Sequence, residues 1–278
     1  MIVEPSDSSA SVVGLRRYPV KSMLGEDLTE LVLTTGGVDG DRALALLDLE
    51  TGHVVTAKHA RLWRKMLQFA AAGDGASVRV TFPDATTVRA TDPDIDRRLS
   101  EVLGRQVRLS DSRSEGATIE RPSPEDVLEH GDDAEVPFDL LEIGQGSSGT
   151  SFVDYAPVHL ITITTIEHLG TEMLRYRPNL VLDTPSGTPY AENAWVGREI
   201  TVGSARLRGI LATPRCAVPT LRHGQLPRAP HAVRTLLTEN RLDLPGFGPQ
   251  PCVGLYAEVL IGGRIRAGDP VRLPNAGT

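Results

Sequence analysis

The chain has 278 residues, which is enough for one large domain or for two domains of ordinary size. Hydrophobic residues make up 40% and charged residues 23%, the ordinary balance of a soluble globular protein. A net charge of −7 gives no electrostatic basis for a general affinity for nucleic acid or for an anionic membrane surface. Because no run of eighteen apolar residues occurs, the sequence predicts no membrane span.

The cysteine content and the first residues bear on the cellular compartment. Cys216 and Cys252 are too few for a disulfide scaffold, although they leave room for a single bridge. The chain begins without the cationic start and apolar core of a secretory signal, so we expect a cytoplasmic protein. In a reducing compartment a cysteine is more often a ligand or a nucleophile than a cross-link.

Short strands dominate the predicted elements of the first part of the chain. Runs rich in Val, Leu and Thr predict strands at residues 12–15, 28–33, 43–48, 52–56, 78–82 and 87–90. The last four of these strands are expected to form two hairpins, 43–48 with 52–56 and 78–82 with 87–90. One helix is expected at residues 94–103, where Gly104 ends an apolar face. Residues 111–149 are polar and lack sustained periodicity, which predicts long loops near a domain junction.

The second part continues this pattern. Helices are expected from a cap at Thr164 or Thr165 to about Tyr176, and again over residues 230–239. Strands are expected at residues 158–163, 180–183, 199–202, 205–208 and 255–260, and the closing segment 263–273 is typical of small barrels. Many short strands, few helices and long connections predict a mainly β fold with barrel architecture rather than alternating βαβ units.

Cys216 is the first candidate for chemistry. The sequence lacks glycine-rich nucleotide loops, zinc-protease motifs and serine-hydrolase elbows, and its histidines do not cluster, so His53, His159 and His168 are interpreted as packing or surface residues. Cys216 follows Arg215 in a proline-rich loop, and an adjacent guanidinium favours the thiolate, the form that attacks electrophiles and binds soft metals. A buried structural cysteine is the alternative interpretation.

Basic and polar side chains at the ends of predicted strands are the second candidate. Lys21 and Ser22 follow the first strand, Arg42 precedes another, and Arg177 and Asn179 precede a third. Lys, Arg and hydroxyl groups in such positions suit a phosphate-bearing cofactor. For each residue taken alone, a solvated surface position is the alternative.

These segments jointly resemble the MOSC family, the domain shared by molybdenum cofactor sulfurases and the mitochondrial amidoxime-reducing component. The similarity runs in order from about Val12 to Leu273 and rests on segments 18–22, 40–42, 44–48, 157–160, 177–181, 190–195, 215–216 and 268–271. It implies a flexible N-terminus over residues 1–10, a MOSC N-terminal β-barrel domain over 11–125 and a β-barrel MOSC domain over 126–278.

The resemblance also implies a cofactor site. Family members with both halves hold a molybdenum pyranopterin (molybdopterin) between the domains, and the position of their metal-ligating cysteine is Cys216 here. The positions that match the family's cofactor contacts are Lys21, Ser22, Arg42, Arg177, Asn179, Pro214, Arg215 and Tyr256. At Pro214 only the backbone can make such a contact. Tyr155-Ala156 stands where relatives often have small or hydroxyl residues, and Cys252 has no family role and is expected to be buried.

The function implied is a molybdenum-dependent reductase of N-hydroxylated small molecules such as amidoximes, hydroxylamines and N-hydroxylated bases. The sequence has no iron–sulfur cluster motif and no appended ferredoxin domain, so separate electron-donor proteins are expected. It also lacks an aminotransferase-like domain, so a complete cofactor sulfurase is not expected. Two alternatives stay open: a sulfur carrier or transferase with a persulfide on Cys216, and a non-catalytic protein that binds or delivers the cofactor.

Overall fold

A computed structural model describes residues 10–147, 149–185 and 187–273. The flexible N-terminus predicted for residues 1–10 lies outside the described residues except for Ala10. Ala10 is buried, and its carbonyl accepts a hydrogen bond of 2.7 Å from the backbone N–H of Val271. In the described part of the chain, no helix is both long and apolar enough to cross a membrane.

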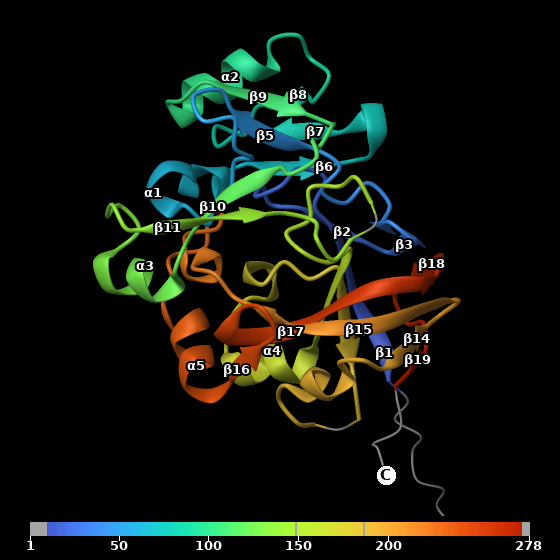
Figure 1. The fold of residues 1–278 in the computed structure, drawn as a ribbon. Coiled ribbons are helices and arrows are strands. Elements are labelled where there is room, and N and C mark those ends of the chain that lie inside the picture. The colour runs from blue at the N-terminus through green and yellow to red at the C-terminus, as the bar shows by residue number, and fades with distance from the viewer. Residues whose placement is uncertain (1–9, 148, 186, 274–278) are drawn as a thin grey trace, which may run out of the picture.

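The lower half of the molecule in Figure 1 is built on one large sheet. Within the described residues it has nine strands. Eight of them lie in the order β19 (Val271–Arg272), β14 (Glu199–Val202), β15 (Ala205–Pro214), β17 (Gly248–Ile261), β12 (Val158–Thr162), β13 (Leu180–Asp183), β1 (Ser11–Arg17) and β2 (Glu26–Leu28). The ninth strand, β16 (Arg241–Leu244), pairs with β17 outside this order. Strand β12 is buried on every residue, as its apolar sequence predicts. Helices α4 (Ile163–Leu169) and α5 (His231–Glu239) pack their apolar residues against Ile161 and Val253 of this sheet.

The upper half in Figure 1 consists of smaller sheets around a second core. Strands β6 (Ala70–Ala72), β7 (Arg79–Thr81) and β8 (Thr87–Arg89) form one sheet, and β5 (Ala45–Asp48) pairs with β9 (Val107–Ser110). Helices α1 (Ala60–Trp63) and α2 (Ile95–Leu103) complete this core with Trp63 and Leu99.

The two halves of the chain exchange segments. Strand β1 pairs with β13, and β3 (Glu30–Thr34) pairs both with β4 (Gly37–Val38) and with β18 (Gly263–Arg266) from the far end of the sequence. In the opposite direction, Ala217, Val218 and Leu221 pack into the core of the first half. Cys216 directly precedes these residues, so the packing fixes its position between the two cores.

The fold class is confirmed: the protein is mainly β with a few helices. Two local predictions are wrong. The segment 111–149 contains β10 (Thr118–Pro122), α3 (Pro124–His130) and β11 (Phe138–Glu142), and the sequence did not predict β11 because nearly all its residues are exposed and no alternation results. Residues 52–56 do fold back onto β5, where an antiparallel bridge joins Leu47 and Val54 and Val55 donates to the carbonyl of Leu46 at 2.8 Å.

The helix predicted from Thr164 or Thr165 to Tyr176 is also wrong in its bounds. Thr162 is the N-cap, and its hydroxyl accepts a hydrogen bond from the backbone N–H of Thr165. The helix ends at Gly170, which adopts the left-handed conformation at φ +58°. A separate short 3₁₀ helix at Met173–Arg175 follows, and this break presents the next residues to the site.

Candidate functional site

A cavity lies where the two cores meet. It brings together seven of the predicted site residues, which come from both halves of the chain: Lys21, Ser22, Arg42, Arg177, Arg215, Cys216 and Tyr256. Its wall also includes Lys58, Arg175, Asp154 and His159, so six basic residues face a single carboxylate. In a protein with a net charge of −7, this concentration of positive charge favours an anionic ligand at this place.

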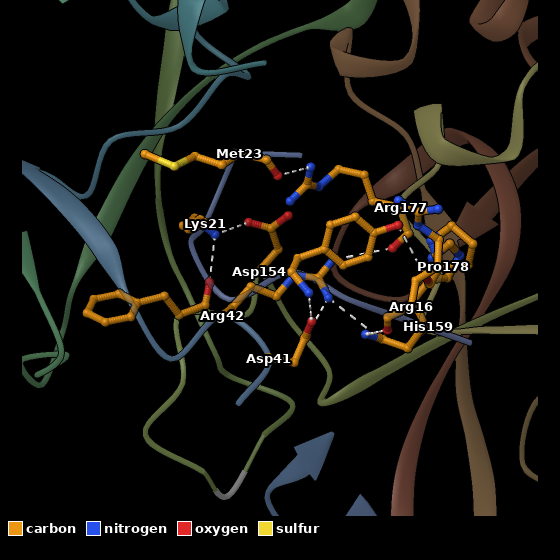
Figure 2. Close-up of polar contacts among 12 residues, drawn as sticks. Arg16, Lys21, Met23, Asp41, Arg42, Asp154, His159, Arg177 and Pro178 are labelled. Carbon is orange, nitrogen blue, oxygen red and sulfur yellow. Dashed lines mark hydrogen bonds and ion pairs between the residues drawn. The ribbon is translucent and has the colours of Figure 1, made fainter. Parts of the chain in front are cut away.

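Two lysines hold the one carboxylate of the cavity. Lys21 Nζ donates to Asp154 Oδ1 at 2.5 Å (Figure 2) and to the carbonyl of Phe152 at 2.8 Å. Lys58 Nζ lies 3.0 Å from Asp154 Oδ2. Burial lowers the pKa of Lys21 to about 8, although the charge of Asp154 opposes the shift. Burial acts against ionisation of Asp154 too, but Lys21 and Lys58 hold its pKa well below the usual range. Asp154 therefore stays ionised and fixes both ammonium groups in place.

Tyr18 and Asp41 support the two central guanidinium groups. The ring of Tyr18 lies 4.7 Å from the guanidinium carbon of Arg42 and 4.3 Å from that of Arg177, so each cation stacks on the same aromatic ring. Asp41 pairs with Arg42 and accepts a hydrogen bond from the backbone N–H of Tyr18 (Figure 2). Burial works against the charge of Arg42, but Asp41 raises its pKa, so it remains a cation.

Arg177 keeps an unused hydrogen-bond donor. Its Nη1 donates to the carbonyl of Met23 at 2.7 Å, whereas Nη2 is buried and has no partner among the described residues. Burial lowers the pKa of Arg177 to about 10, and the charge of Arg42 adds to that shift. A buried cationic donor without a partner is costly, and an anionic group in the cavity would satisfy it.

The backbone is left-handed at three cavity residues. Ser22, Arg42 and Arg177 have φ values of +66°, +46° and +55°, and they are three of the five non-glycine residues with positive φ in the described part of the chain. Such conformations cost about 1–3 kcal/mol each and tend to gather at functional sites. At Ser22 the hydroxyl also accepts a hydrogen bond of 3.1 Å from the backbone N–H of Ala57, which orients the side chain.

Arg215 and His159 form a buried pair beside the cavity. Arg215 Nη2 lies 2.7 Å from His159 Nε2, and because a guanidinium can only donate, that ring nitrogen is the acceptor. Burial, and then the charge of Arg215, lowers the pKa of His159 well below its ordinary value, so the ring is neutral. Gly254 makes room for the ring, since a Cβ there would lie 2.3 Å from His159 Nε2. The interpretation of His159 as an ordinary packing residue therefore missed a residue of the cavity wall.

Cys216 is half-buried in the loop between β15 and a short 3₁₀ helix, Val218–Thr220, and its side chain lines the cavity. Cys252 is fully buried, its thiol donates to the carbonyl of Gln250, and burial raises its pKa to about 11. Both cysteines are free thiols. Of the two, only Cys216 reaches a cavity.

Asn179 and Pro214 take positions behind or beside this wall. Asn179 is buried, and its side-chain oxygen accepts hydrogen bonds from the backbone N–H of His159 at 3.2 Å and from Arg42 Nη1 at 3.4 Å. The structure thus gives it a positioning role toward two cavity residues. Pro214 lines a neighbouring cavity that shares Cys216 with the first.

The residues present fit a metal that arrives within a cofactor. Among the residues that the structure describes, no group of three or more His, Cys, Asp and Glu side chains could hold a metal ion. One thiol beside unpaired and buried cations suits instead a ligand that carries its own anionic anchor and its own metal donors. The unpartnered Nη2 of Arg177 is the observation that supports this fit most directly.

The chain combines a mainly β fold with a cationic cavity between its two cores, and the thiol of Cys216 lines that cavity. Two family models agree with that description: the MOSC domain matches residues 149–272, and the MOSC N-terminal beta barrel domain matches residues 9–118. The chain therefore belongs to the MOSC family and carries its N-terminal β-barrel domain. Membership is consistent with molybdenum cofactor binding or with sulfurase-like chemistry.

Similar solved structures are distant in sequence. The YUAD protein from Bacillus subtilis is 12% identical, with 95% of this chain and 94% of that chain covered and a TM-score of 0.44. YiiM from Geobacillus stearothermophilus is 19% identical, with 44% of this chain and 56% of that chain covered and a TM-score of 0.30. The comparison with curated proteins found no match.

Proposed function

We propose that the protein is a molybdenum cofactor-dependent reductase of N-hydroxylated small molecules. The observation that carries the proposal is the meeting of one accessible thiol, Cys216, with a cavity lined by six basic residues from both halves of the chain. When bound, the cofactor supplies a two-electron redox centre at molybdenum. Reduction of an N–OH group consumes two electrons and two protons and releases the amine or amidine and one water.

The residues of the chain divide the work of binding and protonation. Cys216 provides the soft thiolate ligand, and Lys21, Arg42 and Arg177 bind the anionic anchor of the cofactor. Arg215 and neutral His159 form a fixed wall. Lys58 lines the cavity and is held by Asp154, so its Nζ is the group that we propose donates a proton to the departing oxygen. Separate donor proteins return the electrons.

The proposal is tested by metal analysis and turnover together. The protein is purified from a host that makes the cofactor, molybdenum and pterin are measured per chain, and benzamidoxime is assayed with a chemical reductant. We expect about one molybdenum per chain and reduction to benzamidine. Full molybdenum occupancy without turnover on any N-hydroxylated compound would contradict the reductase and leave a carrier or delivery protein.

The sulfur carrier makes a different prediction. A persulfide on Cys216 requires an accessible thiol but no molybdenum, and the half-buried Cys216 satisfies that requirement. After treatment with a cysteine desulfurase, a carrier would gain the mass of one sulfur at Cys216. The basic lining of the cavity favours cofactor binding over a bare persulfide, because the persulfide needs no set of six cations.

A further inference from the structure

A second cavity adjoins the first at Cys216. The two share five wall residues, which are Lys58, Asp154, Arg215, Cys216 and Tyr256. The thiol is therefore reached from two sides.

The second cavity differs from the first in charge. Its charged residues are nearly balanced, with Lys58, Arg121 and Arg215 against Glu142 and Asp154. It has no excess of cations to hold a phosphate, so it offers no match for the anionic anchor that suits the first cavity.

Apolar and aromatic side chains dominate the rest of its wall. The ring centroids of Tyr155 and Phe247 are 5.6 Å apart with an interplanar angle of 82°, and those of Tyr155 and Tyr256 are 6.0 Å apart at 34°. Ile119 and Leu141, which are paired across β10 and β11, belong to the same wall. Aromatic rings together with aliphatic side chains suit a flat, uncharged ring system.

We propose that this second cavity, defined by Ile119, Leu141, Tyr155, Phe247 and Tyr256, is the substrate chamber and that it selects N-hydroxylated compounds with a flat aromatic body. The proposal rests on the proposed function. The aromatic body lies against Tyr155 and Phe247, and the N–OH end points toward the shared wall, where Cys216 and Lys58 lie. The ring of Tyr155 in the cavity wall then determines selectivity.

The first arm of the test measures binding, independently of turnover. Calorimetry with the molybdenum-loaded protein compares benzamidoxime with acetamidoxime, which lacks the ring. We expect benzamidoxime to bind at least about tenfold more tightly, and Phe247→Ala to reduce that preference roughly fivefold or more through lost ring contacts. Phe247→Tyr should retain it. An unchanged preference in Phe247→Ala overturns the proposal.

The second arm closes the chamber. Leu141→Trp should fill the cavity and abolish benzamidoxime binding, with molybdenum and pterin content unchanged. Leu140→Trp is the matched control, because Leu140 precedes it on β11, is 54% exposed and lies outside the cavity wall. Benzamidoxime binding that survives Leu141→Trp, or loss of molybdenum in that variant, assigns the space elsewhere and overturns the proposal.

The two proposals fail in distinguishable ways. If the loaded protein binds benzamidoxime in a Phe247-dependent manner but reduces nothing, the chamber stands and the reductase fails. If it reduces benzamidoxime while Phe247 and Leu141 have no influence on binding, the reductase stands and the chamber fails. If Leu141→Trp does not fold, the Phe247 series still decides, since Phe247 lies in the turn between β16 and β17.

Discussion

The two cavities that meet at Cys216 present opposite chemistry on either side of one thiol. The first is lined by six basic residues, three of which, Lys21, Arg42 and Arg177, are held in place by buried partners. The second has nearly balanced charge and a wall of aromatic and aliphatic side chains. An anion is stabilised only in the first, and a flat apolar body gains free energy when it leaves water for the second.

Under the proposed function, the first cavity takes the cofactor and the second takes the substrate. The shared wall of Lys58, Asp154 and Arg215 keeps both cavities in contact with the same sulfur. Substitutions on one side should therefore change one kind of binding and leave the other intact. The predictions below test that separation.

The largest effect is expected at the shared thiol. Cys216→Ala should lower turnover by at least roughly a thousandfold, because it removes the proposed metal ligand. The melting temperature should change little, since the side chain is only half-buried. Turnover and thermal denaturation measure the two effects.

Cys252→Ala is the matched control for that substitution. Cys252 is fully buried and donates to a backbone carbonyl, so its loss should lower the free energy of unfolding by about 1–2 kcal/mol and leave turnover unchanged. Full activity in Cys216→Ala, or unfolding of that variant, would show that the thiol has only a structural role.

The next effect concerns the first cavity alone. Arg177→Gln should reduce retention of molybdenum and pterin about tenfold to a hundredfold, the value of a charge-assisted hydrogen bond to a buried anion. Arg266→Gln makes the same charge change at an exposed ion pair with Glu30 and should change nothing. The molybdenum and pterin content of the two variants is measured after dialysis and compared. Loss of benzamidoxime affinity in loaded Arg177→Gln would break the separation between the cavities.

A smaller effect is expected at Gly254, which has φ +78° and lies against His159. Gly254→Ala should lower the free energy of unfolding by about 2–4 kcal/mol, because the left-handed strain adds to clashes with the His159 ring and with the backbone carbonyl of Leu160. Gly104→Ala separates the cost of backbone strain from the cost of the clash. At φ +76° its Cβ would meet nothing within 4 Å, so only about 1–2 kcal/mol is expected. Equal losses in denaturant titrations would rule out crowding at His159.

The smallest effect is a pH dependence of the first cavity. The lowered pKa of Lys21, about 8, means that its charge is lost as the pH rises through that value. The affinity of the cofactor-free protein for pyrophosphate should then fall several-fold between pH 7 and 9, measured by calorimetry. Asp154 and Arg42 keep their charges over this range, because Lys21 and Lys58 hold the pKa of Asp154 well below its usual value and Asp41 raises the pKa of Arg42.

Stability should change in the opposite direction over the same range. Between pH 8 and 10.5 the unfolded chain retains the Lys21 proton that the folded chain has released, so stability rises with pH in that window. The difference in unfolding free energy between wild type and Lys21→Met isolates this contribution. A difference that is flat across the window would show that Lys21 keeps its proton in the folded protein.

The sequence by itself determined the residue types of the site and their local order. Cys216 after Arg215, and cations at the ends of strands at Lys21, Arg42 and Arg177, were predicted because these patterns are local along the chain. The mainly β fold and helix α2 were predicted for the same reason, since periodicity and a terminal glycine act over a few residues.

Only the tertiary structure decided the electrostatic partners and the second cavity. Asp154 lies 133 residues from Lys21 in sequence, and Tyr18 stacks on Arg177 across the two cores, so no local sequence pattern predicts either contact. The neutrality of His159 depends on burial beside Arg215, 56 residues away. Burial and long-range charge are properties of the assembled cores, which is why the sequence predicted the thiol but not the two chemically different cavities on either side of it.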